Sequence, residues 1–284
     1  MRTILTILLA AALAWSAAGC ATSTSAQDQE KVQVAAAFYP LSFAAAVIGD
    51  GRVEVSNLTP PGAEPHDLEV SPGDVRRIRS ADFVLLLGHD FQPQLEDAAG
   101  HGKRVLALLD TPGLDRFPNG DPHVWLDPLR YALIARRIGA ALHEPRRAAR
   151  LAERLRRLDA EYRKGLTRCD RREIVTSHEA FAYVAQRYGL RQIAITGLSP
   201  EAEPAPRDLQ RVVQLVRDTH ATTIFFETLV SPRIAVTVAR ETGARTAVLN
   251  PIEGLTPSEA RRGANYFSLM RANLHTLRQA LGCR

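Results

Sequence analysis

Three histidines and two side chains with oxygen ligands occur where a metal ion could be bound. They are His66 in PPGAEPHDLEVSP (60–72), His123 in NGDPHVWLDP (119–128), His178 in TSHEAF (176–181), and Asn250 and Glu253 in LNPIEGL (249–255). Neutral imidazole is a ligand that favours zinc over hard cations, and three histidines with one carboxylate can close a tetrahedral shell. These residues therefore form a candidate transition-metal site.

The elements that must position these residues are two rounds of alternating strands and helices. Strands are predicted at 31–38, 52–58, 82–88 and 104–109, and again at 173–177, 191–196, 221–227 and 245–250. Helices are predicted near 41–49, 72–80 and 91–99, and near 179–189, 206–219, 231–242 and 257–281. This alternation predicts an α/β protein with two lobes, each holding a four-stranded, mainly parallel sheet flanked by helices.

A long helix is predicted between the two halves. Its apolar residues recur every three or four positions and form one stripe: Ala148, Leu151, Leu155, Leu158, Tyr162 and Leu166. Pro145 marks its start, and a helix over 145–168 would be ~35 Å long at 1.5 Å per residue. We expect a rigid backbone helix within connecting helices at 128–168, between an N-terminal lobe (31–127) and a C-terminal lobe (169–284).

The candidate ligands all follow predicted strands. In open α/β sheets, ligands bind beyond the carboxyl ends of the strands. His66 and His123 follow the second and fourth strands of the first half, whereas His178 and Glu253 follow the first and fourth strands of the second half. Each histidine taken singly is more typical of a hydrogen-bonding or capping role, because no HxxxH or CxxC unit is present. Their joint placement favours ligation in a cleft between the lobes.

The N-terminus predicts export. Residues 1–20, MRTILTILLAAALAWSAAGC, have one arginine, a short apolar run and a small-residue ending, as in a secretory signal. The SAAGC ending resembles the lipobox of bacterial lipoproteins, in which Cys20 would be lipidated after removal of residues 1–19; a plainly cleaved signal peptide is the alternative. Residues 20–30 suit a flexible tether. We expect an extracytoplasmic protein, anchored to the outer face of the cell membrane or periplasmic.

Charge and cysteine content narrow the possible partners. The chain carries 36 Lys and Arg against 31 Asp and Glu, and its basic residues are interleaved with acids, as in RRAARLAERLRRLDAEYRK. That pattern is typical of a solvated helix face and does not predict nucleic-acid binding. If Cys20 is lipidated, Cys169 and Cys283 form the one possible intramolecular disulfide of an exported chain, and two unpaired thiols are the alternative.

Several of these motifs carry a family resemblance. PHDLEVSP, DPHVWLDP, VTSHEAFAYVAQRYGL, FFETLVSP and LNPIEGL resemble, in order, the motifs of the zinc/manganese solute-binding proteins of bacterial ABC importers (cluster A-I, the ZnuA-like family). The resemblance covers nearly the whole mature chain. It implies two lobes joined by a rigid helix, a metal in the cleft, and an ABC permease with its ATPase as partners of a monomer. His66, His123 and His178 match the three histidine positions, and His178 favours zinc because manganese-type members usually carry Glu there.

The sequence departs from the family pattern at two places. The segment before the second histidine, TPGLDRFPNGD, is short and lacks the histidine-rich loop of many zinc-type members. Where many members read L-D-P, this chain has Asn250 in place of the aspartate. We expect Glu253 to be the fourth ligand, with Asn250 and Glu227 as alternatives; Glu227 could instead support a ligating histidine. Glu179 is another candidate for orienting His178.

Three functions remain to be compared. The first is a binding protein that captures Zn²⁺ as cargo for an importer, and the second is the same role with Mn²⁺. The third is a zinc hydrolase, which needs three protein ligands, an exchangeable water and a nearby base. The sequence has no HExxH unit, nucleophile elbow or Ser/His/Asp arrangement. We therefore expect a zinc-binding protein that is not an enzyme.

Overall fold

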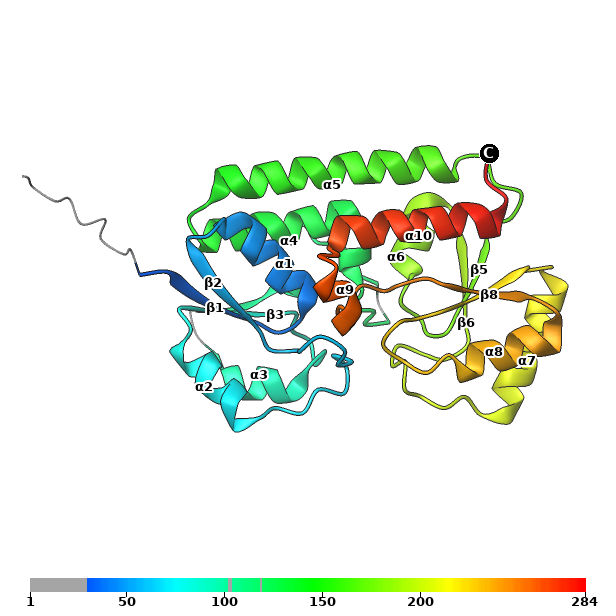
Figure 1. Cartoon of the computed structure of the whole chain (residues 1–284), viewed down its shortest axis with the longest axis horizontal. Coiled ribbons are helices and arrows are strands. Elements are labelled where there is room, and N and C mark those ends of the chain that lie inside the picture. Colours follow the sequence, from blue (N-terminus) through cyan, green and yellow to red (C-terminus); the bar gives the residue numbers. More distant parts are fainter. Residues whose placement is uncertain (1–29, 102–103, 118) are drawn as a thin grey trace, which may run out of the picture. The chain divides into compact units, whose positions relative to one another are not determined.

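Two four-stranded parallel sheets organise the protein, as the alternation of strands and helices predicts. The computed structural model describes residues 30–101, 104–117 and 119–284 (Figure 1). The first sheet has the order β2-β1-β3-β4 and comprises β1 (Val32–Ala36), β2 (Val53–Asn57), β3 (Phe83–Leu86) and β4 (Val105–Ala107). The second has the order β6-β5-β7-β8 and comprises β5 (Glu173–Thr176), β6 (Arg191–Ala194), β7 (Thr223–Phe226) and β8 (Arg245–Val248). The predicted fold class is confirmed.

Helices alternate with the strands in both halves. The first half holds α1 (Tyr39–Gly49), α2 (Pro72–Ser80) and α3 (Pro93–Ala99), and the second half holds α6 (Ala182–Tyr188), α7 (Pro206–Asp218) and α8 (Arg233–Thr242). Their starts follow from local chemistry. Ser71 and Asp74 form a capping box ahead of α2, with a proline at the first helical position. These short helices leave the strand ends free to carry functional loops.

Two parts of the helix prediction are wrong in detail. The helix expected over 257–281 is two helices, α9 (Pro257–Arg261) and α10 (Tyr266–Leu281). Gly263 adopts a left-handed φ of 68°, and the Asn265 side chain accepts hydrogen bonds from the first turn of α10, so a new helix begins there. The helix expected from 179 begins only at Ala182, because the preceding residues form the turn that follows β5.

The long helix between the halves is α5 (Pro145–Leu166, 22 residues), and it begins at the predicted proline. It packs against α1 and α4 (Pro128–Ala141) from the first half and against α6 and α10 from the second. The predicted stripe faces inward, and its six members are buried. Tyr162 of this stripe donates a hydrogen bond from Oη to the Met270 carbonyl at 2.6 Å. Residues 31–284 form one compact unit, and the lobe boundaries stay a prediction.

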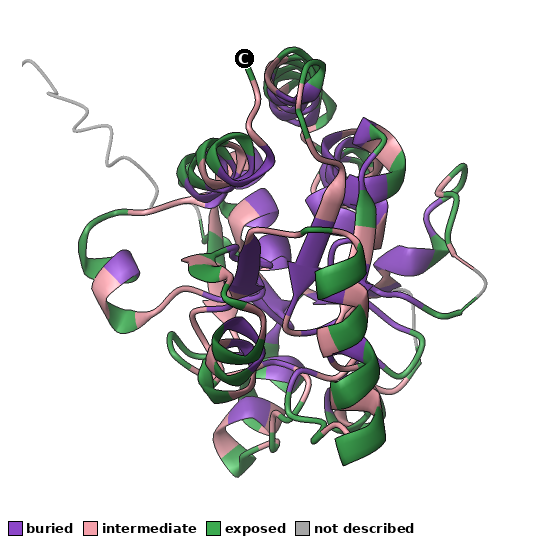
Figure 2. Ribbon diagram, turned by 90° about the vertical axis from the view of Figure 1, so that its right-hand side faces the viewer, coloured by how far each residue is buried: buried purple, intermediate pink, exposed green. Residues whose placement is uncertain are grey.

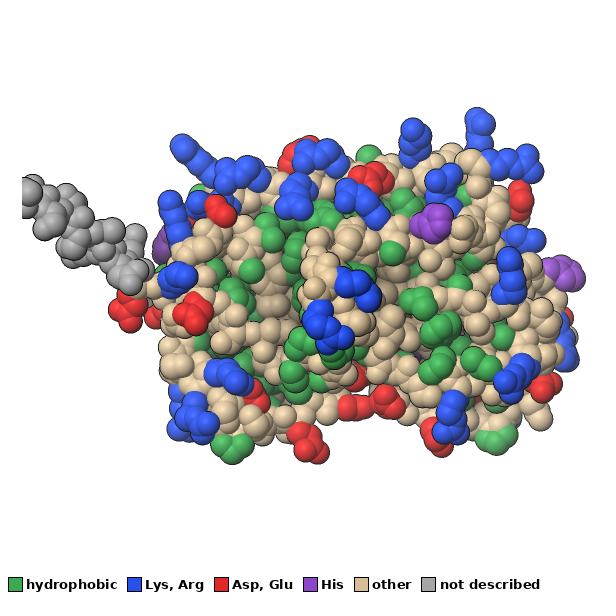
Figure 3. Space-filling model, in the orientation of Figure 1, with side chains coloured by type: hydrophobic (Ala, Val, Ile, Leu, Met, Phe, Trp, Pro, Cys, Tyr) green, Lys and Arg blue, Asp and Glu red, His purple; other side chains and the backbone are tan. Residues whose placement is uncertain are grey.

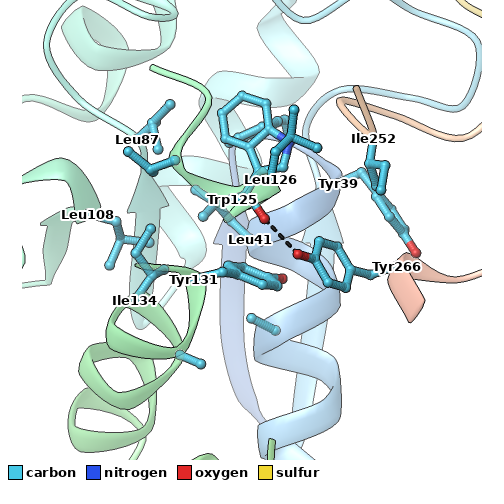
Figure 4. Packing of buried hydrophobic residues seen from close by; sticks show 14 of the residues in the cluster. Tyr39, Leu41, Leu87, Leu108, Trp125, Leu126, Tyr131, Ile134, Ile252 and Tyr266 are labelled. Carbon is cyan, nitrogen blue, oxygen red and sulfur yellow. Dashed lines mark hydrogen bonds between the residues drawn. The ribbon is translucent and has the colours of Figure 1, made fainter. Parts of the chain in front are cut away.

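The larger hydrophobic core runs through both halves, and a smaller one lies among β5, β6, β7, α7 and α8 of the second half. Figure 2 shows buried residues along the strands and on the inner sides of the helices. An aromatic group made of Trp125, Tyr131 and Tyr266 lies at the centre of this packing (Figure 4), where Tyr266 Oη donates to the Trp125 carbonyl at 2.6 Å. Trp125 belongs to the short 3₁₀ helix Val124–Leu126 that directly follows His123. Trp125 is therefore a core residue, and the core supports the His123 segment from beneath.

The predicted disulfide is present. Cys169, just after α5, is bonded to Cys283, just after α10, across 114 positions of sequence. Of the helices in the described part of the chain, none could cross a membrane. The predicted signal peptide, the lipidation site at Cys20 and nearly all of the tether lie outside the described residues.

The disulfide should contribute strongly to stability. It closes a loop of more than a hundred residues, so the Cys169→Ser/Cys283→Ser variant should lose about 2–5 kcal/mol in its free energy of unfolding. Urea unfolding followed by circular dichroism measures the loss. The unsubstituted chain in reducing agent serves as the control and should unfold like the variant. Equal unfolding midpoints in all three samples would contradict the prediction.

Candidate metal centre

The four side chains favoured by the sequence come together at one point. His66 lies between β2 and α2, His123 follows β4, His178 follows β5 and Glu253 follows β8. Each offers one ligand atom, and these atoms all lie within 4.8 Å of one another. His123, His178 and Glu253 are buried, whereas the His66 side chain keeps 12% of its surface exposed. The group therefore unites loops from both sheets and is reached by solvent on the His66 side.

The spacing of these atoms suits a tetrahedral metal shell. Glu253 Oε1 lies 3.0 Å from His123 Nε2, 3.4 Å from His66 Nε2 and 3.6 Å from His178 Nε2. The Nε2 atoms of His123 and His178 are 3.2 Å apart. Four ligand atoms held at about 2.0–2.1 Å from a tetrahedral zinc ion are spaced about 3.3 Å from one another. The side chains could thus surround such an ion with little rearrangement.

Carboxylates fix the orientation of two of the imidazole rings. His123 Nδ1 lies 2.7 Å from Asp121 Oδ1, and His178 Nδ1 lies 2.6 Å from Glu227 Oε1. A proton on each Nδ1 donates to these acceptors, so each Nε2 can bind a metal ion once the proton that it donates to Glu253 has left. Glu227 thus supports His178, the role that the sequence analysis gave as its alternative to ligation. Sequence reasoning missed Asp121, although its place two residues before His123 was a usable signal.

Further contacts hold the His123 segment and the His66 ring in place. The backbone N–H of His123 donates to Asp121 Oδ1 at 2.9 Å, and the Tyr183 hydroxyl donates to the Asp121 carbonyl at 3.0 Å. The His66 ring meets the Phe91 ring edge to face, with centroids 4.7 Å apart. His66 thus sits against an apolar wall, and among the described residues its Nδ1 has no carboxylate partner.

The Glu253 loop is shaped by Asn250. Asn250 Oδ1 accepts a hydrogen bond from the backbone N–H of Ile252 at 2.7 Å, and Ile252 has a left-handed φ of 60°. That conformation is unfavourable for a β-branched residue and persists only where surrounding contacts impose it. Asn250 and Asn273 also exchange two hydrogen bonds, at 2.9 and 2.6 Å. Asn250 is therefore engaged in holding the turn that presents Glu253, and it is not part of the ligand cluster.

The Glu253 loop is also tied to the first half of the chain. Trp125 Nε1 donates to the Pro251 carbonyl at 2.8 Å. The Trp125 ring in turn packs against the His123 ring, with centroids 5.2 Å apart. One indole therefore fixes the distance between a ligand segment from the first half and the Glu253 loop from the second.

The electrostatics of the site favour positive charge. Burial would raise the pKa of Glu253, but hydrogen bonds from the three histidines hold it well below its usual value. Burial would likewise lower the pKa of His178, yet Glu227 and Glu253 raise it to about 10. Burial, with the charge of Glu253 next in importance, raises the pKa of Glu64 to about 9. A buried position that stabilises imidazolium so strongly also suits a divalent cation.

Glu179 and His89, a further histidine that follows a strand, lie apart from the cluster. Glu179 is half-buried and accepts a long hydrogen bond from Asn119 Nδ2 at 3.5 Å, so the idea that it orients the His178 ring is wrong. His89 is exposed and pairs with Asp110 at 2.7 Å. Neither residue belongs to the group of ligand atoms.

Comparisons with known proteins agree with this geometry. A family profile described as "Zinc-uptake complex component A periplasmic" matches residues 34–280. The zinc-binding lipoprotein AdcA of Streptococcus pneumoniae is 33% identical, with 97% of this chain and 60% of that protein aligned. The high-affinity zinc uptake system protein ZnuA of Bacillus subtilis is 29% identical over 97% of this chain and 96% of its own. The chain thus spans about three fifths of AdcA.

A solved structure extends the likeness to the fold. The Zn(II)-bound ZnuA-like domain of Streptococcus pneumoniae AdcA superposes with a TM-score of 0.75 at 33% identity. The superposition covers 89% of this chain and 99% of that domain.

The role of Asn250 can be tested by stability. The Asn250→Ala variant leaves the Ile252 N–H without its acceptor and removes a donor to Glu259 Oε1 at 3.4 Å, both in a buried turn. We expect a loss of about 2–3 kcal/mol in the free energy of unfolding, measured in urea. His275→Ala, on the exposed side of α10, is the control and should stay within about 0.5 kcal/mol of the unsubstituted chain. Similar losses in the two variants would argue against the role assigned to Asn250.

Proposed function

We propose that this chain, which belongs to the zinc-uptake complex component A (ZnuA) family, captures Zn²⁺ between its two sheets and delivers it to an ABC importer. The observation that carries the proposal is the set of four ligand atoms from His66, His123, His178 and Glu253, whose spacing suits one tetrahedral ion. Zinc-binding proteins of similar sequence and fold support the same assignment.

Ligand chemistry favours zinc over manganese. Mn²⁺ prefers carboxylate, carbonyl and water oxygens, whereas imidazole suits zinc. Three of the four ligand atoms are imidazole nitrogens, and their close approach leaves room for a small four-coordinate shell. His178, at the position where manganese-type relatives usually carry Glu, supports this preference.

The same arrangement argues against hydrolysis. A catalytic zinc keeps an open position for water and needs a base nearby. Here Glu253 occupies the fourth position, and Glu227 is held by the His178 ring at 2.6 Å. The family is that of a transport component, so its members bind their ion and release it unchanged.

Entry and release of the ion would begin at His66. The other three ligands are buried, and each is restrained, His123 by Asp121, His178 by Glu227 and Glu253 through Asn250. His66 alone among the four is partly exposed, and it lies on the long segment between β2 and α2. Movement of that segment would open the shell while the other three ligands stay in place.

The proposed role in an importer implies which proteins this chain contacts and where it acts. A solute-binding component acts outside the cytoplasm, where it meets a permease coupled to an ATPase, and the family description is of a periplasmic protein. The lipobox-like ending supports a lipid anchor at Cys20, which would hold a monomer at the outer face of the membrane. Relatives named as lipoproteins agree with that anchor.

Removing ligands should weaken zinc binding in a graded way. His178→Ala should lower the zinc affinity by orders of magnitude, because it removes a fully buried ligand that leaves a gap in the shell. Glu253→Ala should have a smaller but clear effect. Competition titration against a chelator measures both, and His275→Ala is the matched control because that histidine is exposed. If Glu253→Ala binds zinc with normal affinity while Asn250→Ala does not, the assignment of Glu253 as the fourth ligand is wrong.

A hydrolase assay on the same samples tests the function itself. The zinc-loaded chain should bind zinc without hydrolysing ester or peptide substrates. Turnover that disappears with Glu227→Gln or Glu253→Ala would replace the importer proposal by the hydrolase alternative.

The Glu227 carboxylate should matter through His178. Glu227→Gln replaces a charged acceptor at 2.6 Å from His178 Nδ1 by a neutral amide and should weaken zinc affinity about 10–100-fold. Glu179→Gln is the matched control, since Glu179 neighbours His178 in sequence without contacting its ring. Equal affinities of the two variants would show that Glu227 does not orient the ligand.

A further inference from the structure

The helix α5 has as large a net positive charge as the whole chain. Pro145–Leu166 contains eight Lys and Arg residues and three acids, which gives a net charge of +5. The full chain also has a formal net charge of +5, so all other residues together sum to zero. The net positive charge of the chain thus equals that of this single helix.

Much of this charge is exposed and unpaired. The acids of α5 are already engaged, Glu153 by two arginines of the same helix, Asp159 by Arg163 and Glu161 by Arg271. Within the described residues, five exposed cations of α5 and its C-terminal extension make no ion pair: Arg146, Arg150, Arg154, Lys164 and Arg168. Figure 3 shows Lys and Arg side chains gathered along the edge where α5 lies. In the described part of the chain, these five cations therefore have no acidic side chain as an ion-pair partner.

The basic face lies on the side away from the metal centre. In Figure 1 α5 and α10 form one side of the body, whereas α2, α3, α7 and α8 lie on the other side of the sheets. The segment between β2 and α2, which carries His66, is on that second side in Figure 1. A partner bound along α5 would therefore leave the entrance to the metal centre free.

The described chain begins beside the N-terminal end of α5. The backbone N–H of Val32 donates to the Arg52 carbonyl at 3.2 Å. The Arg52 guanidinium in turn pairs at 2.9 Å with Glu144, the residue that precedes α5. The start of the described chain is thus linked through Arg52 to the start of the basic helix.

We propose that the outer face of α5 (the five unpaired cations named above) rests on anionic phospholipid headgroups of the membrane to which the chain is anchored. Charge complementarity supports this partner, because basic residues near an anionic bilayer are each attracted to it. The stretch from Cys20 to Glu30 reaches about 35 Å when extended, similar to the roughly 33 Å length of α5. The proposal rests on the lipid anchor proposed above for its geometry and is independent of zinc binding.

Such a contact would set the orientation of the anchored protein. With α5 on the headgroups, the His66 side faces outward, where zinc is captured. Docking on a permease in the same membrane would need the opposite face, so the contact must be reversible. Exposed charge pairs are weak and screened by salt, with a Debye length of about 10 Å at 0.1 M, which makes the contact suitably labile.

Vesicle binding tests the proposal without the lipid anchor. The mature chain, residues 20–284 with Cys20→Ser, is mixed with vesicles of phosphatidylcholine alone or with added phosphatidylglycerol, and bound protein is measured by co-sedimentation. We expect binding to the anionic vesicles only, and its loss as salt rises to about 1 M, where the Debye length is about 3 Å. The variant Arg146→Gln/Arg150→Gln/Lys164→Gln/Arg168→Gln should bind at least ~100-fold more weakly, at about fivefold per cation removed. Arg154 is left in place because it packs over Phe267.

A matched control separates position from total charge. Arg76→Gln/Arg79→Gln/Arg233→Gln/Arg240→Gln removes four exposed arginines that make no ion pair in the described structure, and it should keep most of the vesicle binding. Equal losses in the two variants, no binding of the unsubstituted face at low salt, or binding to a soluble polyanion but not to vesicles would each overturn the proposal. Zinc titration of both variants should be unchanged and shows that they are folded. If the unsubstituted chain bound no zinc, the proposed function would be refuted, whereas the result with vesicles would still stand.

Discussion

The structure around the metal centre depends on one arrangement, in which a carboxylate oxygen faces three imidazole nitrogens. Glu253 Oε1 lies 3.0–3.6 Å from the Nε2 atoms of His66, His123 and His178, almost fully out of water. Burying ionisable groups is costly unless each has partners for its remaining hydrogen-bonding atoms. Asp121 and Glu227 supply those partners for two of the histidines, and the Asn250 turn fixes the carboxylate. The surrounding polar network therefore follows from the burial of the site.

The ligands come from loops of two separate sheets, and their relative positions must be held to within about 0.5 Å. A site of this kind must be held by side chains whose own positions are fixed by packing. Trp125 does so directly, because it packs on His123 and donates to the Pro251 carbonyl of the Glu253 loop. Behind it, Tyr266 of α10 donates to the Trp125 carbonyl, and α5 packs against helices from both halves. The long helix and the aromatic core thus act together as the frame of the metal centre.

The sequence predicts those parts of the protein that depend on local pattern. Alternating strands and helices give two parallel sheets, and the strand-end rule brings His66, His123 and His178 to one place, as the structure shows. The break between α9 and α10 was missed because the apolar pattern continues across it, whereas a left-handed Gly263 and the Asn265 cap decide it. The fourth ligand stayed open between Glu253, Asn250 and Glu227 because the choice depends on a turn held by Asn273, 23 positions away. Asp121 was missed although its place two residues before His123 is a usable signal, because its contact with the His123 ring is seen only in the folded chain.

The distribution of charge explains how a protein with a positive net charge can bind a cation. A net charge of +5 spread evenly over the surface would oppose the approach of a divalent ion. Here the surplus lies on α5, across the sheets from the His66 segment, and charges separated by more than the Debye length of about 8–10 Å are largely screened in water. Around the site itself Glu227 and Glu253 make the local environment favourable to cations. Because the two kinds of charge occupy opposite sides, the same chain can attract a metal ion on one side and an anionic surface on the other.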